Sequence, residues 1–116
     1  MGRRSANTKV KIPTGDTESS WQRCCANATH VMVMGPATLE ARTYTIEVTD
    51  NPDASSVVVR TLQTDIVTPA NVALPVADVS KPMRELIGCL AFRLKSNGAI
   101  TDEDEATWHF DALEDY

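Results

Sequence analysis

Short segments in which apolar and polar residues alternate, each bounded by turn-forming residues, constrain the fold of this chain more than any other feature. In the clearest of them, Tyr44, Ile46 and Val48 alternate with threonines and a glutamate. Successive side chains of a β-strand point to opposite faces of a sheet, so this pattern predicts a half-buried strand. Similar short apolar segments predict further strands at residues 30–34, 56–62, 89–95 and 106–110.

Turn signals separate these segments, most clearly at residues 35–36, 50–53 and 96–98, where glycine, proline, asparagine and aspartate gather. Short strands with turns at intervals of about ten residues indicate a sandwich or barrel of antiparallel strands. Residues 81–88 fit two structures. Pro82 can occupy the first turn of a short helix, whereas alternate residues can form one face of a strand, and we favour the strand.

The two ends of the chain carry opposite charge. Residues 1–11 contain four basic residues and no acidic residue, whereas residues 101–116 contain seven acidic residues and no Lys or Arg. Complementary charge between partners favours orientation and a fast association rate. The distribution therefore suggests a protein that attaches to copies of itself or to a partner surface.

The N-terminal segment differs in composition from the rest. Residues 1–20 are rich in Gly, Ser, Thr, Asn and charged residues, and Val10 and Ile12 are their only sizeable apolar residues after Met1. Such a segment cannot bury enough apolar surface to fold alone. We therefore expect a flexible or extended N-terminal arm at residues 1–20 and a β-sandwich domain at residues 21–116.

The arm and its junction with the domain supply the residues that we expect to bind a partner. Trp21 stands at this junction, where it either closes the end of the core or anchors the arm on a neighbouring subunit. Trp is enriched at interface hot spots because it buries a large area and donates a hydrogen bond. The predicted partner-binding residues are Arg3, Arg4, Lys9, Lys11 and Trp21.

Charge and hydropathy exclude several classes of partner. A net charge of −5 argues against direct nucleic-acid binding, because neutralising phosphates requires a basic surface. No apolar run approaches the roughly 20 residues that a membrane-spanning helix needs, and no apolar stretch follows the basic N-terminus as in a signal peptide. We therefore expect synthesis in the cytoplasm, with no membrane partner.

The cysteines and histidines do not predict a metal site or a nucleophile. Cys24 and Cys25 are adjacent, whereas a short spacer separates the paired ligands of a zinc site. We expect these two residues and Cys89 to be buried free thiols. His30 and His109 each lie in an apolar segment and are expected to be strand residues rather than catalytic bases.

The acidic run at residues 102–105 lacks the spaced Asp/Asn/Gly pattern of a calcium-binding loop. We expect it to be a solvated hairpin tip, or alternatively to lie against Arg3 and Arg4 of a neighbouring copy. The chain contains no phosphate-binding loop, dinucleotide-binding fingerprint or nucleophile elbow. No catalytic residue, metal or cofactor is therefore predicted, and we expect a protein that is not an enzyme.

Three stretches together resemble small β-rich structural proteins of tailed bacteriophages, among them head decoration (cement) proteins. They are HVMVMGPATLEARTYTIEVTDNPDAS at residues 30–55, AFRLKSNGAITDEDEATWHF at residues 91–110, and the Thr/Pro/Ala-rich stretch between them. The resemblance implies a jelly-roll-like sandwich, a symmetric homo-oligomer that is often a trimer, and binding to a capsid lattice. It implies no catalytic residues, and it does not include the arm at residues 1–20.

Two functions follow from these observations as hypotheses. The first is a virion structural protein on the capsid surface that bridges neighbouring subunits of the major capsid protein, with the arm making contacts. Deletion of residues 1–20 would then leave the domain folded and weaken attachment. The second is a carbohydrate- or ligand-binding β-sandwich of a fibre or tail, for which Trp108 and Tyr116 are the candidate aromatic platform. An enzyme of unknown type is the least favoured hypothesis.

Overall fold

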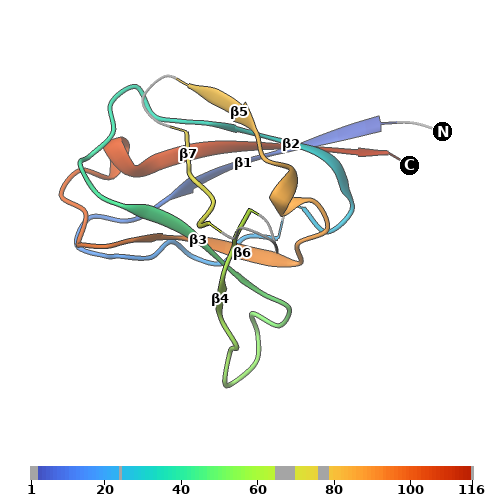
Figure 1. Ribbon diagram of the computed structural model, residues 1–116, viewed down its shortest axis with the longest axis horizontal. Coiled ribbons are helices and arrows are strands. Elements are labelled where there is room, and N and C mark those ends of the chain that lie inside the picture. Colours follow the sequence, from blue (N-terminus) through green and yellow to red (C-terminus); the bar gives the residue numbers. More distant parts are fainter. Residues whose placement is uncertain (1–2, 24, 65–69, 76–78, 116) are drawn as a thin grey trace.

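The computed structural model describes residues 3–23, 25–64, 70–75 and 79–115, which form β-strands, two 3-10 helices and connecting loops (Figure 1). The strands are β1 (Arg3–Lys11), β2 (Ala28–Met34), β3 (Tyr44–Thr49), β4 (Arg60–Thr61), β5 (Ser80–Pro82), β6 (Ala91–Ser96) and β7 (Thr107–Asp115). The 3-10 helices are η1 (Arg84–Leu86) and η2 (Glu103–Ala106). This part of the chain contains no α-helix, so the predicted all-β class is confirmed.

The strands form two antiparallel sheets. One sheet has the order β1-β7-β2-β5 and the other has the order β4-β3-β6. The chain passes repeatedly from one sheet to the other, so most neighbours within a sheet are distant in sequence. Figure 1 shows the two layers lying one above the other, with β1 beginning and β7 ending side by side at one end of the molecule.

The segment from residue 14 to residue 22 lies along the free edge of β6. The N–H of Ser19 donates to the carbonyl of Leu94 at 3.0 Å. Gln22 and Phe92 exchange two backbone hydrogen bonds, of 2.7 and 2.9 Å. This irregular extended segment therefore covers the β6 side of the second sheet.

One apolar core lies between the two sheets and draws side chains from both. Phe110 of β7 and Phe92 of β6 bring their ring centroids to 4.8 Å, and Trp108 meets the edge of Tyr44 at 4.9 Å. Burying a large apolar side chain contributes about 1.5–3 kcal/mol, so these contacts are a major source of stability. The largest fully buried side chains are Trp108, Phe92, Phe110, Ile12, Ile46, Met83, Leu86, Leu94, Ile100, Val10, Val33 and Val72.

The folded body begins in β1 and not near Trp21, which corrects the expectation of an arm separate from the domain. All of β1 pairs with β7, from Arg3 opposite Asp115 to Lys11 opposite Thr107. Val10 and Ile12 are fully buried in the core. A polar composition misled the sequence argument, because an edge strand needs apolar residues on only one of its faces.

The other predicted strands are confirmed except at two places. The segments at residues 30–34, 43–49, 89–95 and 106–110 match β2, β3, β6 and β7. The strand expected at residues 56–62 is limited to the two residues of β4. The favoured strand at residues 81–88 ends at Pro82, and η1 follows it. Met83 and Leu86 are both fully buried, and their spacing of three matches one turn of a 3-10 helix.

Within the described part of the chain, no helix has the length and apolar character needed to cross a membrane.

Candidate functional site

The two oppositely charged ends of the chain lie side by side within one molecule. In the β1–β7 register, Arg4 lies opposite Glu114. At the other end of β1, Lys11 lies close to η2. The ammonium nitrogen of Lys11 lies 3.1 Å from an oxygen of Glu103. The acidic run therefore meets the basic strand β1 of its own chain through Lys11.

The acidic run forms a capped 3-10 turn. Asp102 caps η2 by accepting a hydrogen bond from the N–H of Asp104 at 3.0 Å. The hydrogen bond from Lys11, together with the N–H of Thr14, lowers the pKa of Glu103. Asp102 and Asp104 are exposed, as expected for a solvated tip, whereas Glu103 is half-buried. No cluster of metal-binding side chains is found among the described residues.

A carboxylate from a distant loop organises the same region. Glu40 accepts hydrogen bonds from the N–H groups of Thr101 and Asp102 at 3.0–3.1 Å, and from the Thr101 hydroxyl. The bond from the Asp102 N–H is the largest cause of the lowered pKa of Glu40. Together with a backbone hydrogen bond from Glu40 to Glu105, of 3.1 Å, this side chain holds the acidic turn against the β2–β3 loop.

The outer face of the first sheet mixes methionines with ionisable residues. His109 of β7 lies between Lys9 of β1 and Met34 of β2. Two residues further along β7, Asp111 lies between Asn7 and Met32. Met32 and Met34 are each 39% exposed. Both His30 and His109 are exposed on this face, in agreement with the prediction that they are strand residues. This face therefore combines two partly exposed methionines with ionisable side chains.

Trp21 lies on the outer face of the second sheet and is outside the apolar core. The guanidinium carbon of Arg93 is 4.5 Å from the centroid of the Trp21 ring. Arg93 also forms ion pairs with Glu18 at 3.0 Å and with Glu47 at 2.9 Å. A hydrogen bond from Lys95 is the main cause of the lowered pKa of Glu18. Trp21 is therefore half-buried beneath a network of charges rather than a plug at the end of the core.

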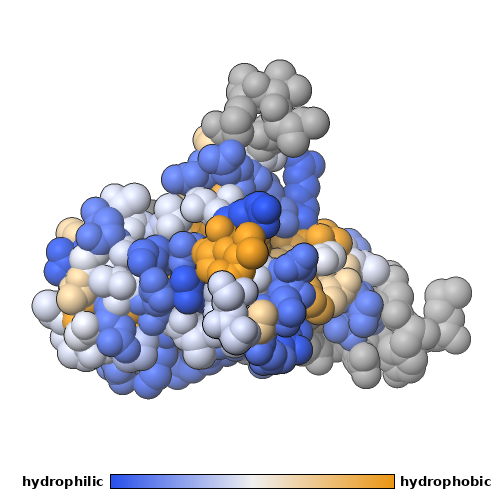
Figure 2. Space-filling model, turned by 90° about the horizontal axis from the view of Figure 1, so that it is seen from below, coloured by the Kyte–Doolittle hydropathy of each residue, from blue (hydrophilic) through white to orange (hydrophobic). Residues whose placement is uncertain are grey.

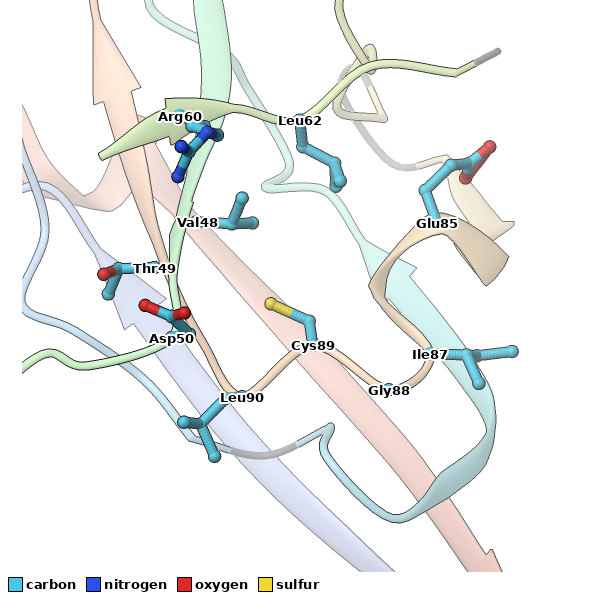
Figure 3. A pocket seen from close by; sticks show the side chains of 10 residues that line it. All are labelled: Val48, Thr49, Asp50, Arg60, Leu62, Glu85, Ile87, Gly88, Cys89 and Leu90. Atoms are coloured by element: carbon cyan, nitrogen blue, oxygen red, sulfur yellow. The ribbon is translucent and has the colours of Figure 1, made fainter. Parts of the chain in front are cut away.

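An apolar groove of about 460 Å³ opens beside the end of β3 (Figure 3). Val48, Leu62 and Cys89 form its floor, and all three are partly buried against the core. Ile87 and Leu90 flank it and are 41% and 42% exposed. Seen from the side of the second sheet, exposed apolar surface gathers into patches that polar residues surround (Figure 2).

Three charged residues stand around this groove. Asp50, Arg60 and Glu85 line it, and none of them forms an ion pair with another described residue. Glu85 lies at the opposite end of the groove from Asp50 (Figure 3). An apolar floor with a few charged groups at its rim is the usual composition of a ligand pocket.

The cysteines differ from one another. Cys89 is a free thiol whose Sγ donates to the carbonyl of Ala91 at 3.2 Å, and burial raises its pKa. It therefore stays neutral near pH 7 and is part of the apolar floor of the groove. Cys25 is buried but takes part in a disulfide, so the expectation of a free thiol is wrong for this residue. Cys24 lies outside the described residues.

The expected aromatic platform for sugars does not form around Trp108. Its side chain is completely buried, and its indole N–H donates to the carbonyl of Pro75 at 3.1 Å. Tyr116, the other candidate, lies outside the described residues. The residues that line the groove include no aromatic side chain.

No protein-family model, curated protein or solved structure matches this chain. Sequence reasoning named the basic residues of β1 and Trp21, and the structure separates them onto different sheets. It missed the groove, because Val48, Leu62 and Leu90 come from segments that no local pattern connects.

Proposed function

We propose that this chain is a non-enzymatic virion structural protein that decorates and stabilises a phage capsid. In this proposal the protein lies on the capsid surface and bridges neighbouring copies of the major capsid protein. It also associates with copies of itself, and the resemblance to decoration proteins implies that this homo-oligomer is often a trimer. The fold proposed for it is a jelly-roll-like β-sandwich. The order in which the strands pair is the observation that carries the proposal.

A jelly roll is one long antiparallel hairpin that is rolled up, so the first strand pairs with the last and pairing continues inward. If the segment at residues 14–22 is counted as a strand, the described part of the chain has eight strands. The first and last strands pair as β1 and β7, and the next pair is the segment at residues 14–22 with β6. The inner pairs are β2 with β5 and β3 with β4. This is the order expected of a jelly roll, a fold common in viral capsid domains.

A long regular strand at the edge of a sheet supports the proposal further. Exposed edges invite pairing with other chains, and an assembly covers them. β1 has nine residues and is the outermost strand of its sheet. A lattice also multiplies weak contacts, because several modest contacts per particle give a large effective affinity.

The test is co-sedimentation of the purified protein with empty capsid shells of the phage that encodes it. We expect saturable binding that the charge-reversed variant Lys9→Glu weakens. Arg84→Glu is the matched control, because Arg84 is also exposed but lies on η1, away from β1. Light scattering should also show a discrete oligomer. Failure of the unmodified protein to bind the shells would refute the proposed function.

The groove favours a second candidate, a ligand-binding module of a fibre or tail. Its apolar floor suits an apolar ligand better than a sugar, because sugar sites need an exposed aromatic ring and the groove has none. The test is fluorescence of the apolar dye 1-anilinonaphthalene-8-sulfonate. We expect binding that Leu90→Asp abolishes and Val79→Asp, at an exposed apolar residue outside the groove, leaves unchanged. Equal binding by both variants would remove this candidate.

A further inference from the structure

The direction of the backbone groups in β1 can be derived from one hydrogen bond. The N–H of Ile12 donates to the carbonyl of Ala106 at 3.1 Å, one step beyond the pair formed by Lys11 and Thr107. In an antiparallel ladder, alternate residues direct both their N–H and C=O to the same neighbour. Val10 therefore directs its backbone groups toward β7, as do the other even-numbered residues of β1.

The odd-numbered residues of β1 direct their backbone groups the other way. Asn7, Lys9 and Lys11 thus present N–H and C=O groups at the outer edge of the sheet. β1 is the last strand in the order of its sheet, and no described residue forms a backbone hydrogen bond with this outer edge. The register with β7 is continuous over the whole strand, without a bulge.

The other sheet edges in the described part of the chain offer much less. β5 has three residues and β4 has two. The free side of β6 is covered by the segment at residues 14–22. β1 also contains no proline, a residue that commonly blocks exposed edges. Among the sheet edges that the structure describes, the outer edge of β1 alone combines length with a regular register.

Charge decides what kind of strand the edge accepts. β1 carries four basic residues and no acidic residue, and one of them, Lys11, already pairs with Glu103. Antiparallel pairing of two copies about Asn7 would place Arg3 of one copy opposite Lys11 of the other. Like charges directly opposite each other destabilise a strand pair, whereas opposite charges stabilise it. Lys9 is exposed and has no ion-pair partner among the described residues.

We infer that the outer edge of β1 binds an extended acidic segment of a partner protein as an added β-strand. Backbone hydrogen bonds to the odd-numbered residues would hold the segment, and its carboxylates would lie beside the basic side chains. The inference deepens the proposed function, because it names how a capsid partner would be held. The inference is tested with a peptide, whereas the proposed function is tested with capsid shells. A negative result in one experiment therefore does not decide the other.

The probe is a nine-residue synthetic peptide in which Glu alternates with Val and Thr, and its partner probe has Lys in place of Glu. Hydrogen exchange is followed by NMR with and without the peptide. We expect the amides of Asn7, Lys9 and Lys11 to gain protection, whereas those of Thr8 and Val10 are already protected by β7. Unchanged exchange at the odd-numbered amides in saturating acidic peptide would overturn the inference.

A pair of substitutions at Asn7 separates backbone from side-chain effects. Asn7→Pro removes an outward N–H and leaves the ladder with β7 intact, since proline is tolerated on the open side of an edge strand. We expect it to weaken binding of the acidic peptide about tenfold or more, given the loss of a hydrogen bond and the clash of the ring. Asn7→Ala retains the N–H and should bind as the unmodified protein does. Equal binding by Asn7→Pro and Asn7→Ala would contradict the inference.

The charge preference is tested at Lys9. Lys9→Glu should lower the affinity for the Glu peptide and raise that for the Lys peptide. Circular dichroism and a melting curve establish that each variant is folded before binding is measured, and the exchange experiment on the unmodified protein does not depend on any variant. Equal affinity of the unmodified protein for the two peptides would overturn the choice of an acidic partner.

Discussion

The ammonium nitrogen of Lys11 lies 3.1 Å from a carboxylate oxygen of Glu103, although the two residues are 92 positions apart in the sequence. Lys11 ends β1 and Glu103 begins η2, just before β7. The contact therefore joins the basic start of the chain to its acidic end. Part of the charge that suggested attachment between molecules is in fact satisfied within one molecule.

Acid should weaken this contact. The pKa of Glu103 is lowered in the folded protein from its usual value of 4.5, chiefly by Lys11. A carboxyl whose folded pKa is lowered contributes stability above its unfolded pKa, and this stability is lost as the pH falls through the folded pKa. We expect Glu103→Gln to have a smaller loss of unfolding free energy than the unmodified protein as the pH falls below 4.5, measured by urea unfolding.

The matched control for this measurement is Asp104→Asn. It removes a charge from the same turn, but no hydrogen bond joins the Asp104 side chain to Lys11. Its acid dependence should remain that of the unmodified protein. If Glu103→Gln and the unmodified protein lose stability in parallel, the contact between Lys11 and Glu103 contributes nothing in solution.

Deletion of residues 1–12 should prevent stable folding. The deletion removes the buried side chains of Val10 and Ile12, which contribute about 1.5–3 kcal/mol each. It also uncovers one edge of β7. This outcome replaces the expectation, from the sequence, that removal of residues 1–20 leaves the domain folded. A cooperative melting transition of the truncated chain, close to that of the full chain, would show that β1 is dispensable.

The contact between the two sheets should be sensitive to loss of Phe110. Phe110→Ala removes a fully buried ring that lies 4.8 Å from the ring of Phe92, and we expect a loss of about 3–5 kcal/mol in unfolding free energy. Met32→Ala, on the exposed face of neighbouring β2, should change stability by about 0.5 kcal/mol or less. Chemical denaturation of the two variants gives their unfolding free energies. Similar losses of unfolding free energy in both would show that Phe110 is not part of the core.

Trp21 should report on the outer face of the second sheet. We expect Trp21→Phe to remove most of the fluorescence that iodide can quench, because Trp108 is completely buried and Trp21 is half-exposed. Trp21→Ala should cost about 0.5–1 kcal/mol through loss of the contact with Arg93. Trp108→Phe is the reciprocal control, in which quenching should persist. A Trp21→Phe variant that iodide quenches as strongly as the unmodified protein would show that Trp108 is accessible.

Alkaline pH should destabilise the protein through Tyr44. Burial is the main cause that raises the pKa of Tyr44 to about 12, and its hydroxyl donates to the carbonyl of Glu40 at 2.8 Å. Because the folded pKa is the higher one, stability is complete below the unfolded pKa and falls as the pH rises from 10 to about 12. Unfolding of Tyr44→Phe should be less dependent on pH in this range. An identical dependence in both proteins would mean that Tyr44 ionises freely.

The local pattern of the sequence was sufficient to locate most strands. Alternation of Tyr44, Ile46 and Val48 with polar residues predicts a strand that the structure contains as β3. Such a pattern reports which faces of a segment are apolar, and this property belongs to the segment itself. β1 was not predicted because only Val10, together with Ile12 just beyond the end of the strand, marks its buried face. η1 was not predicted because residues 81–88 contain two patterns. The spacing of Met83 and Leu86 fits a 3-10 turn, and the alternation of side chains in the same segment fits a strand equally well.

The sequence by itself therefore determined that the chain is all-β, where most of its strands lie, and that its ends differ in charge. The tertiary structure decided which strands pair, because pairing depends on contacts between residues far apart in the chain. The Lys11–Glu103 contact, the open outer edge of β1 and the groove between Val48 and Leu90 all arise in this way. Their energies come from surfaces that meet only when the two sheets have packed together.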